Sequence, residues 1–139
     1  MKAIILAAGE GTHLSPFSET RPISMIGVAG RSMLDNTFGL LKSAGINDIF
    51  IVVGHKKDKL IERLQQQDHN VLNLHYVEQK RKLGIGHAVM QVKNKISPGE
   101  YFLLLYGDTL TAENIFSKVQ QSFHSFKCPV ASFCLPPSN

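Results

Sequence analysis

KAIILAAGEGT, residues 2–12, joins a strand-length apolar run to a loop of small residues. Residues 2–6 are short, continuous and rich in isoleucine, which is typical of a strand buried on both faces of a parallel sheet. The glycines at 9 and 11 allow a tight turn, and the N–H groups of such a turn can hold phosphate oxygens. Alone, a Gly-x-Gly turn is equally compatible with a purely structural role.

Strand-like runs and helical periods alternate along the rest of the chain. A loop is expected over 7–18. Further strands are predicted at 48–53, 71–77, 101–106 and 129–135, and helices at 31–45, 58–67, 86–95 and 112–123. This alternation predicts a parallel sheet with helices on both faces, joined by right-handed crossovers. The expected fold class is therefore α/β, a Rossmann-like three-layer sandwich with a mostly parallel sheet.

The composition bounds the class of protein. The chain has 139 residues, of which 43% are hydrophobic and 19% charged, and this fits one folded domain. Its apolar runs are far shorter than the roughly 20 residues that span a bilayer, and the N-terminus lacks the features of a signal peptide. Cys128 and Cys134 form neither a zinc set nor a disulfide scaffold. We expect a cytoplasmic protein without a membrane anchor.

The net charge of +4 is mildly basic, which suits a ligand bearing phosphate and gives little support to nucleic-acid binding. Two basic loops, 55–59 and 80–82, either steer such a ligand or are ordinary solvated loops. They follow predicted strands, as do 7–12 and 107–109. Ligands of open α/β sheets bind outside the carboxyl ends of the strands, near the switch in strand order. We therefore expect the functional site on this edge.

Two common phosphate-binding motifs are absent from the sequence. No Gly-Lys-Ser/Thr is present, so the loop is not a P-loop. The dinucleotide fingerprint needs a third glycine where Leu14 stands and an acid near Val53, where Gly54 and His55 follow instead. Dinucleotide binding is therefore disfavoured.

An ordered set of motifs is more specific than any one of them. In order, the motifs are LAAGEGT (6–12), Pro16, ETRP (19–22), VAGRSML (28–34), YVEQ (76–79), LGIGHA (83–88) and YGD (106–108). Taken together they resemble the sugar-phosphate nucleotidylyltransferases, which join a sugar 1-phosphate to a nucleoside triphosphate and release pyrophosphate. The resemblance implies a fold of the nucleotide-diphospho-sugar transferase type. It covers nearly the whole chain, yet the family's catalytic domain continues further. Residues 1–139 therefore look like a nucleotidyltransferase-like domain, incomplete at its C-terminus, that holds the nucleotide-binding half.

The resemblance also implies roles for individual residues. Gln79 matches a glutamine that hydrogen-bonds the base, since an amide both donates and accepts. Gly84 matches a glycine packed near the base. Asp108 matches an aspartate that holds the catalytic Mg²⁺, an ion that favours carboxylate oxygen; its alternative role is to cap the next helix. The loop that wraps the nucleoside and triphosphate is matched by Leu6, Ala7, Ala8, Gly9, Gly11 and Thr12.

Two departures from the family pattern bear on catalysis. His13 stands where the family has arginine, and Ile23 stands where it has a lysine whose charge offsets the triphosphate. Losing one preorganised donor in an active site typically costs about 10²–10³ in rate. Arg31 keeps a charge where the family often has lysine, and either meets phosphate or is a solvated residue at a helix start. His13 and Arg31 are thus the candidate catalytic cations. Smaller departures replace prolines by Ser24, Gly27 and Ser32, and threonine by Ile85.

Two functions remain open. The first is a nucleotidylyltransferase that acts on a nucleoside triphosphate and a sugar 1-phosphate with Mg²⁺. The second is an impaired relative that serves as a nucleotide-binding, regulatory or assembly subunit. His87, beside the expected base site, is assigned to helix capping or packing before catalysis. Because a shortened sheet would leave apolar surface bare, we expect a homo-oligomer or a partner subunit that covers it.

Overall fold

The computed structural model describes residues 1–12, 15–69, 71–111 and 115–126. Its main sheet has four strands in the order β5-β4-β1-β6. All three pairings are parallel, which confirms the predicted class. These strands are β1 (Lys2–Ala7), β4 (Asp48–Val53), β5 (Asn73–Glu78) and β6 (Phe102–Tyr106). The strand predicted at 129–135 and both cysteines lie outside the described residues.

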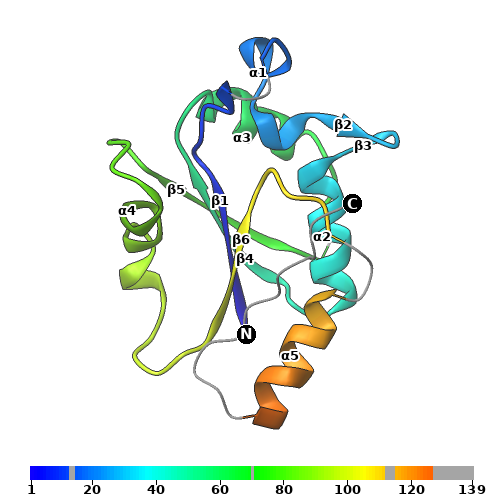
Figure 1. The fold of residues 1–139 in the computed structure, drawn as a ribbon, viewed down its shortest axis with the longest axis vertical. Helices are drawn as coiled ribbons and strands as arrows, with labels where there is room; N and C mark the ends of the chain where they lie inside the picture. Colours follow the sequence, from blue (N-terminus) through cyan, green and yellow to red (C-terminus); the bar gives the residue numbers. More distant parts are fainter. Residues whose placement is uncertain (13–14, 70, 112–114, 127–139) are drawn as a thin grey trace, which may run out of the picture.

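The central strand β1 makes contact with both helical layers. In register, Ala3 lies beside Ile49 of β4, and Lys2 beside Phe102 of β6. Figure 1 shows α4 (Ile85–Met90) on one side of the sheet and α2 (Met33–Ser43) and α5 (Ile115–Phe126) on the other. The sheet and its two helical layers form the predicted three-layer sandwich.

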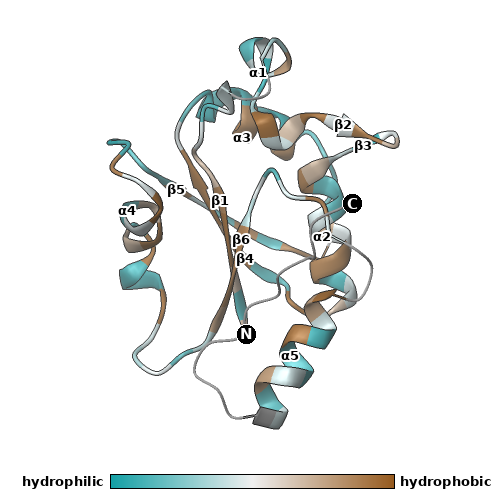
Figure 2. Ribbon diagram, viewed as in Figure 1, coloured by the Kyte–Doolittle hydropathy of each residue, from teal (hydrophilic) through white to brown (hydrophobic). Residues whose placement is uncertain are grey.

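Alternate side chains of β1 supply the two cores. Ile5 is fully buried on the face that also packs α3 (Lys57–Gln65), through Leu60 of that helix. Ile4 is fully buried on the opposite face, in a smaller core that includes Ala88 of α4. Figure 2 shows the hydrophobic residues running along β1 in the middle of the sheet. A strand buried on both faces explains the unbroken apolar run in the sequence.

The helix predicted at 31–45 begins at Met33 instead. The Ser32 hydroxyl accepts a hydrogen bond from the Asp35 N–H at 3.0 Å, and the Asp35 carboxylate accepts one from the Ser32 N–H at 3.3 Å. This capping box ends the preceding strand and starts α2. Residues before it form a hairpin that the sequence pattern missed, with strands β2 (Gly27–Val28) and β3 (Arg31–Ser32).

The remaining helices differ from the prediction mainly in length. The helix predicted over 86–95 divides into α4 and the 3₁₀ turn η3 (Lys93–Lys95). The loop predicted over 7–18 contains the start of a short helix, α1 (Phe17–Thr20), which is followed by the 3₁₀ turn η2 (Ile23–Met25). No helix among the described residues has the length and apolar character needed to cross a bilayer.

The basic loop at 55–59 holds α1 in place. Lys56 adopts a left-handed conformation with φ of 54°, and its ammonium donates to the carbonyls of Ser18 and Glu19, the latter at 2.7 Å. Lys59 donates to the Thr20 carbonyl at 3.2 Å. Carbonyls in the last turn of a helix lack partners within the helix, and these two cations supply them. Part of the predicted solvated loop is therefore structural.

Candidate functional site

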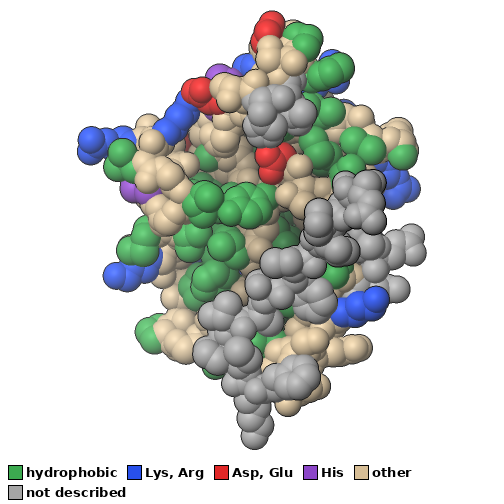
Figure 3. All heavy atoms as spheres, viewed as in Figure 1, with side chains coloured by type: hydrophobic (Ala, Val, Ile, Leu, Met, Phe, Trp, Pro, Cys, Tyr) green, Lys and Arg blue, Asp and Glu red, His purple; other side chains and the backbone are tan. Residues whose placement is uncertain are grey.

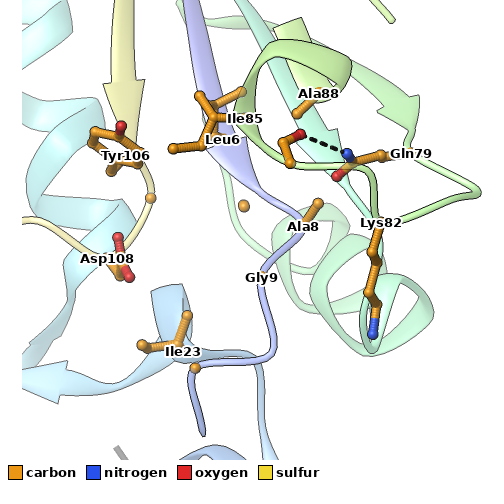
Figure 4. Close-up of a pocket in the computed structure, with 14 residues that line it drawn as sticks. Leu6, Ala8, Gly9, Ile23, Gln79, Lys82, Ile85, Ala88, Tyr106 and Asp108 are labelled. Atoms are coloured by element: carbon orange, nitrogen blue, oxygen red, sulfur yellow. Dashed lines mark hydrogen bonds between the residues drawn. The ribbon is translucent and has the colours of Figure 1, made fainter. Parts of the chain in front are cut away.

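A cavity of about 310 Å³ opens where the strand order reverses, at the carboxyl ends of β1 and β6. Figure 4 shows Asp108 and Ile23 on one side of it and Gln79 and Lys82 on the other, with Gly9 between them. The lining residues are Leu6, Ala7, Ala8, Gly9, Gly11, Ile23, Gln79, Lys82, Gly84, Ile85, Ala88, Tyr106, Gly107 and Asp108. Most of the residues predicted to bind nucleotide are thus brought together.

The glycine loop closes tightly on the turn η2. Gly11 has φ of +63°, and a Cβ added there would lie 2.7 Å from Cδ1 and 2.8 Å from Cβ of Ile23. Glycine is required on both counts, the left-handed backbone and the close approach. Ile23 is only 4% exposed and lines the cavity. An apolar side chain therefore fills the place where the resemblance expects lysine.

Two more glycines press against the end of β1 and fix where the loop starts. A Cβ on Gly54 would lie 2.9 Å from the Ala8 Cβ, and one on Gly107 would lie 3.2 Å from the Leu6 carbonyl oxygen. The Gly107 N–H donates to that carbonyl at 2.9 Å. A glycine therefore follows each neighbouring strand, because a side chain there would crowd the end of β1.

The other side of the cavity carries a buried amide. Gln79 is 8% exposed, and its Nε2 donates to the Gly84 carbonyl at 3.1 Å. The same nitrogen lies 3.1 Å from Nδ1 of His87, and Gln91 donates to the His87 carbonyl at 2.9 Å. Hydrogen bonds therefore fix the orientation of the amide before any ligand arrives. His87 packs in α4 as expected, and its contact with Gln79 was not foreseen.

Asp108 directly follows Gly107 at the end of β6 and is half-buried. It is the only carboxylate among the described lining residues. The described part of the chain contains no cluster of three His, Cys, Asp or Glu side chains able to hold a metal. One carboxylate still fits Mg²⁺, which usually keeps several waters and takes one or two protein carboxylates plus substrate phosphates.

Lys82 is the only cation among the described lining residues. Its ammonium pairs with the Glu10 carboxylate of the glycine loop. This hydrogen bond and charge lower the pKa of Glu10 below its usual value. The sequence placed Lys82 merely in a basic loop. Its position between Gln79 and Gly84, both assigned to the site, was the signal that could have singled it out.

Two predicted residues do not line this cavity, and the structure does not describe a third. Thr12 and Arg31 are exposed and are not among its lining residues, Arg31 lying in the β2–β3 hairpin. His13 lies outside the described residues. The roles predicted for these three side chains stay predictions.

Comparison with known proteins identifies the class. Residues 2–136 match the family model described as nucleotidyl transferase, and the chain belongs to that family. It is 38% identical over 115 residues, 83% of this chain and 26% of the relative, to a bifunctional protein GlmU of Methanococcus maripaludis. It is 33% identical over 121 residues to the UTP–glucose-1-phosphate uridylyltransferase AglF of Haloferax volcanii, covering 87% of this chain and 49% of that one.

A solved structure shares the fold. UDP-glucose pyrophosphorylase from Acinetobacter baumanii superposes with a TM-score of 0.77 at 23% identity, over 91% of this chain and 53% of that one. The relatives named here are thus sugar-phosphate nucleotidyltransferases. The chain spans between about a quarter and a half of their length.

Proposed function

We propose that this chain is the nucleotide-binding part of a sugar-phosphate nucleotidylyltransferase. The reaction transfers a nucleoside monophosphate from a nucleoside triphosphate to a sugar 1-phosphate, giving an NDP-sugar and pyrophosphate. One observation carries the proposal. At the switch in strand order, a single cavity gathers the glycine loop, a buried glutamine amide and a carboxylate. Family membership over residues 2–136 supports it.

Different lining residues would bind different parts of the nucleotide. Gln79 would hydrogen-bond the base edge beside Gly84. N–H groups of the loop at Gly9 and Gly11 would hold phosphate oxygens. Asp108 would hold Mg²⁺, which when bound neutralises phosphate charge. A phosphate oxygen of the sugar 1-phosphate then attacks the α-phosphorus in line, and the bond from that phosphorus to the pyrophosphate oxygen breaks. His13 and Arg31 remain the proposed cations for the departing charge.

The second candidate is a nucleotide-binding or regulatory subunit without turnover. Ile23 favours it, because this buried side chain occupies the phosphate side of the cavity and offers no donor. Protein groups in phosphoryl transfer act mainly by positioning and electrostatics, so a missing cation reduces rate more than it reduces binding of the nucleoside.

An apolar face suggests a partner for either candidate. β6 is one of the two edge strands of the described sheet, and Phe102, Leu104 and Tyr106 are exposed on it. Ile85 and Met90 of α4 are exposed as well. Figure 3 shows hydrophobic side chains gathered on this view of the molecule, between the positions of α4 and β6. We expect a second copy or another subunit to cover this face, which light scattering and dye binding would detect.

Isothermal titration tests the proposal. The chain is titrated with UTP, dTTP, GTP, CTP and ATP, each with and without Mg²⁺, and Asp108→Asn serves as the matched variant. Mg²⁺-dependent binding of one nucleotide, with the dependence lost in Asp108→Asn, is the expected result. Pyrophosphate release with a sugar 1-phosphate separates the two candidates. Absence of binding by all five nucleotides would refute both.

A further inference from the structure

An ion pair joins a lysine of the cavity lining to the glycine loop. The ammonium of Lys82 meets the carboxylate of Glu10, 72 residues away in the sequence. Glu10 lies between Gly9 and Gly11, in the loop assigned to the phosphates. The Lys82 ammonium therefore already lies beside that loop, where it is paired with the carboxylate of Glu10.

This pair is important because the described cavity lining contains a single cation. Ile23 cannot donate, and Lys82 is the only cation among the described residues of the lining. A lysine ammonium is a compact charge with three donors on a flexible four-carbon stem, so it can change partners without moving the backbone. A triphosphate carries more negative charge than one carboxylate, so it competes strongly with Glu10 for the Lys82 ammonium.

The pair is also easy to open. The side chains of Lys82 and Glu10 are 52% and 48% exposed. Exposed ion pairs contribute little to stability, because water and salt screen them and the side chains lose freedom on pairing. Opening this pair therefore costs the fold little, whereas an unpaired Glu10 carboxylate beside the loop would repel phosphate.

We propose that Lys82 binds the phosphates of the nucleotide and that Glu10 competes for it, so that nucleotide binding exchanges one partner of Lys82 for another. This rests on the proposed nucleotide site. Glu10 then acts as a built-in competitor that lowers the affinity of the site.

Opposite signs in two variants distinguish this exchange from a simple structural tie. Lys82→Gln is expected to weaken binding of the preferred triphosphate about 5- to 10-fold, by the scale of one charge-assisted contact. Glu10→Gln is expected to strengthen it about 2- to 5-fold. Lys80→Gln removes the same charge from the same loop, outside the cavity lining, and should change affinity less than 2-fold. Both variants weakening binding would mean that the pair only holds the loops together, and would overturn the proposal.

The probes are the five nucleoside triphosphates and inorganic tripolyphosphate, titrated calorimetrically at low and high salt. Nucleotide binding that is equal in Lys82→Gln and Lys80→Gln overturns this inference and leaves the proposed function in place. Tripolyphosphate binding that needs Lys82, without preference for any nucleotide, supports the phosphate contact and overturns the proposed function. Binding of neither probe overturns both.

Discussion

At one end of the cavity a buried amide is held by hydrogen bonds, whereas at the other an isoleucine fills the space beside the glycine loop. Gln79 donates to the Gly84 carbonyl at 3.1 Å and touches His87. Ile23 packs against Gly11. Lys82, the only cation among the described lining residues, lies instead on the side of Gln79 (Figure 4) and is paired with Glu10 of the glycine loop. The end assigned to the base is organised for recognition. The end assigned to phosphate has the shape for binding but little charge for catalysis.

The largest expected effect comes from supplying that charge. His13→Arg with Ile23→Lys, in a chain that carries the rest of the catalytic domain, should raise turnover about 10²-fold or more, since each change restores the cation that the family pattern has at that position. Pyrophosphate release measures it. Ile23→Met is the matched control because it lengthens the side chain without adding charge. A double variant no faster than this control would show that catalysis is limited elsewhere, and would favour the regulatory role.

The packing of the glycine loop on Ile23 can be tested separately from the charge. Gly11→Ala forces a Cβ onto Ile23 in a left-handed backbone, and should lower the free energy of unfolding by about 1–3 kcal/mol. Urea denaturation measures it. Gly9→Ala is the control from the same loop, because a Cβ there meets nothing within 4 Å. Equal stability of the two variants would contradict the close packing of the loop on Ile23.

At the other end, Gln79→Leu keeps the volume and removes the amide. Nucleotide affinity should fall about 10-fold, which is within the range of about 1–3 kcal/mol for buried polar groups left without partners. The differences in affinity among the five nucleotides should become smaller. Calorimetric titration with the five triphosphates measures both. Gln91→Leu removes an amide that contacts His87 from outside the cavity and should leave affinity nearly unchanged. If Gln79→Leu keeps full base preference, the base is recognised elsewhere.

The smallest effect concerns a buried hydroxyl behind the phosphate end. Ser24 is 0% exposed, and its Oγ has no hydrogen-bond partner among the described residues. Ser24→Ala should leave the free energy of unfolding unchanged or raise it by up to about 1 kcal/mol, because a desolvated group is removed. Ser32→Ala removes a hydroxyl that caps α2 and should cost about 1 kcal/mol. Thermal unfolding compares the two; a clear loss in Ser24→Ala would reveal a partner for that hydroxyl.

Local patterns in the sequence predicted the elements and the positions that such patterns control. The strand at 48–53 has the predicted bounds, since five apolar residues in a row leave little choice for a short buried segment. Strand ends predicted that the glycine loop, Gln79 and Asp108 lie on one edge of the sheet, and the resemblance to the family assigned their roles. The parallel topology brings them to one cavity.

Contacts between distant segments could not be predicted in this way. The β2–β3 hairpin has two residues in each strand and turns through Ala29 and Gly30, whose positive φ angles no periodicity records. The position of α1 depends on Lys56, and the role of Lys82 on Glu10. Each depends on a tertiary neighbour, and a single sequence read along its length does not contain that neighbour.

The central place of β1 has a consequence during synthesis. Lys2 pairs with Phe102, so the ribosome must add about 100 residues before the second edge of β1 finds its partner, which takes about 5–20 s at ordinary elongation rates. Throughout that interval the edge of β1 that pairs with β6 keeps unpaired backbone groups, a feature that templates aggregation. A strand that is interior in the finished sheet is thus open along one edge in the nascent chain, and slower translation or a chaperone at the ribosome exit is expected to alter the yield of folded protein.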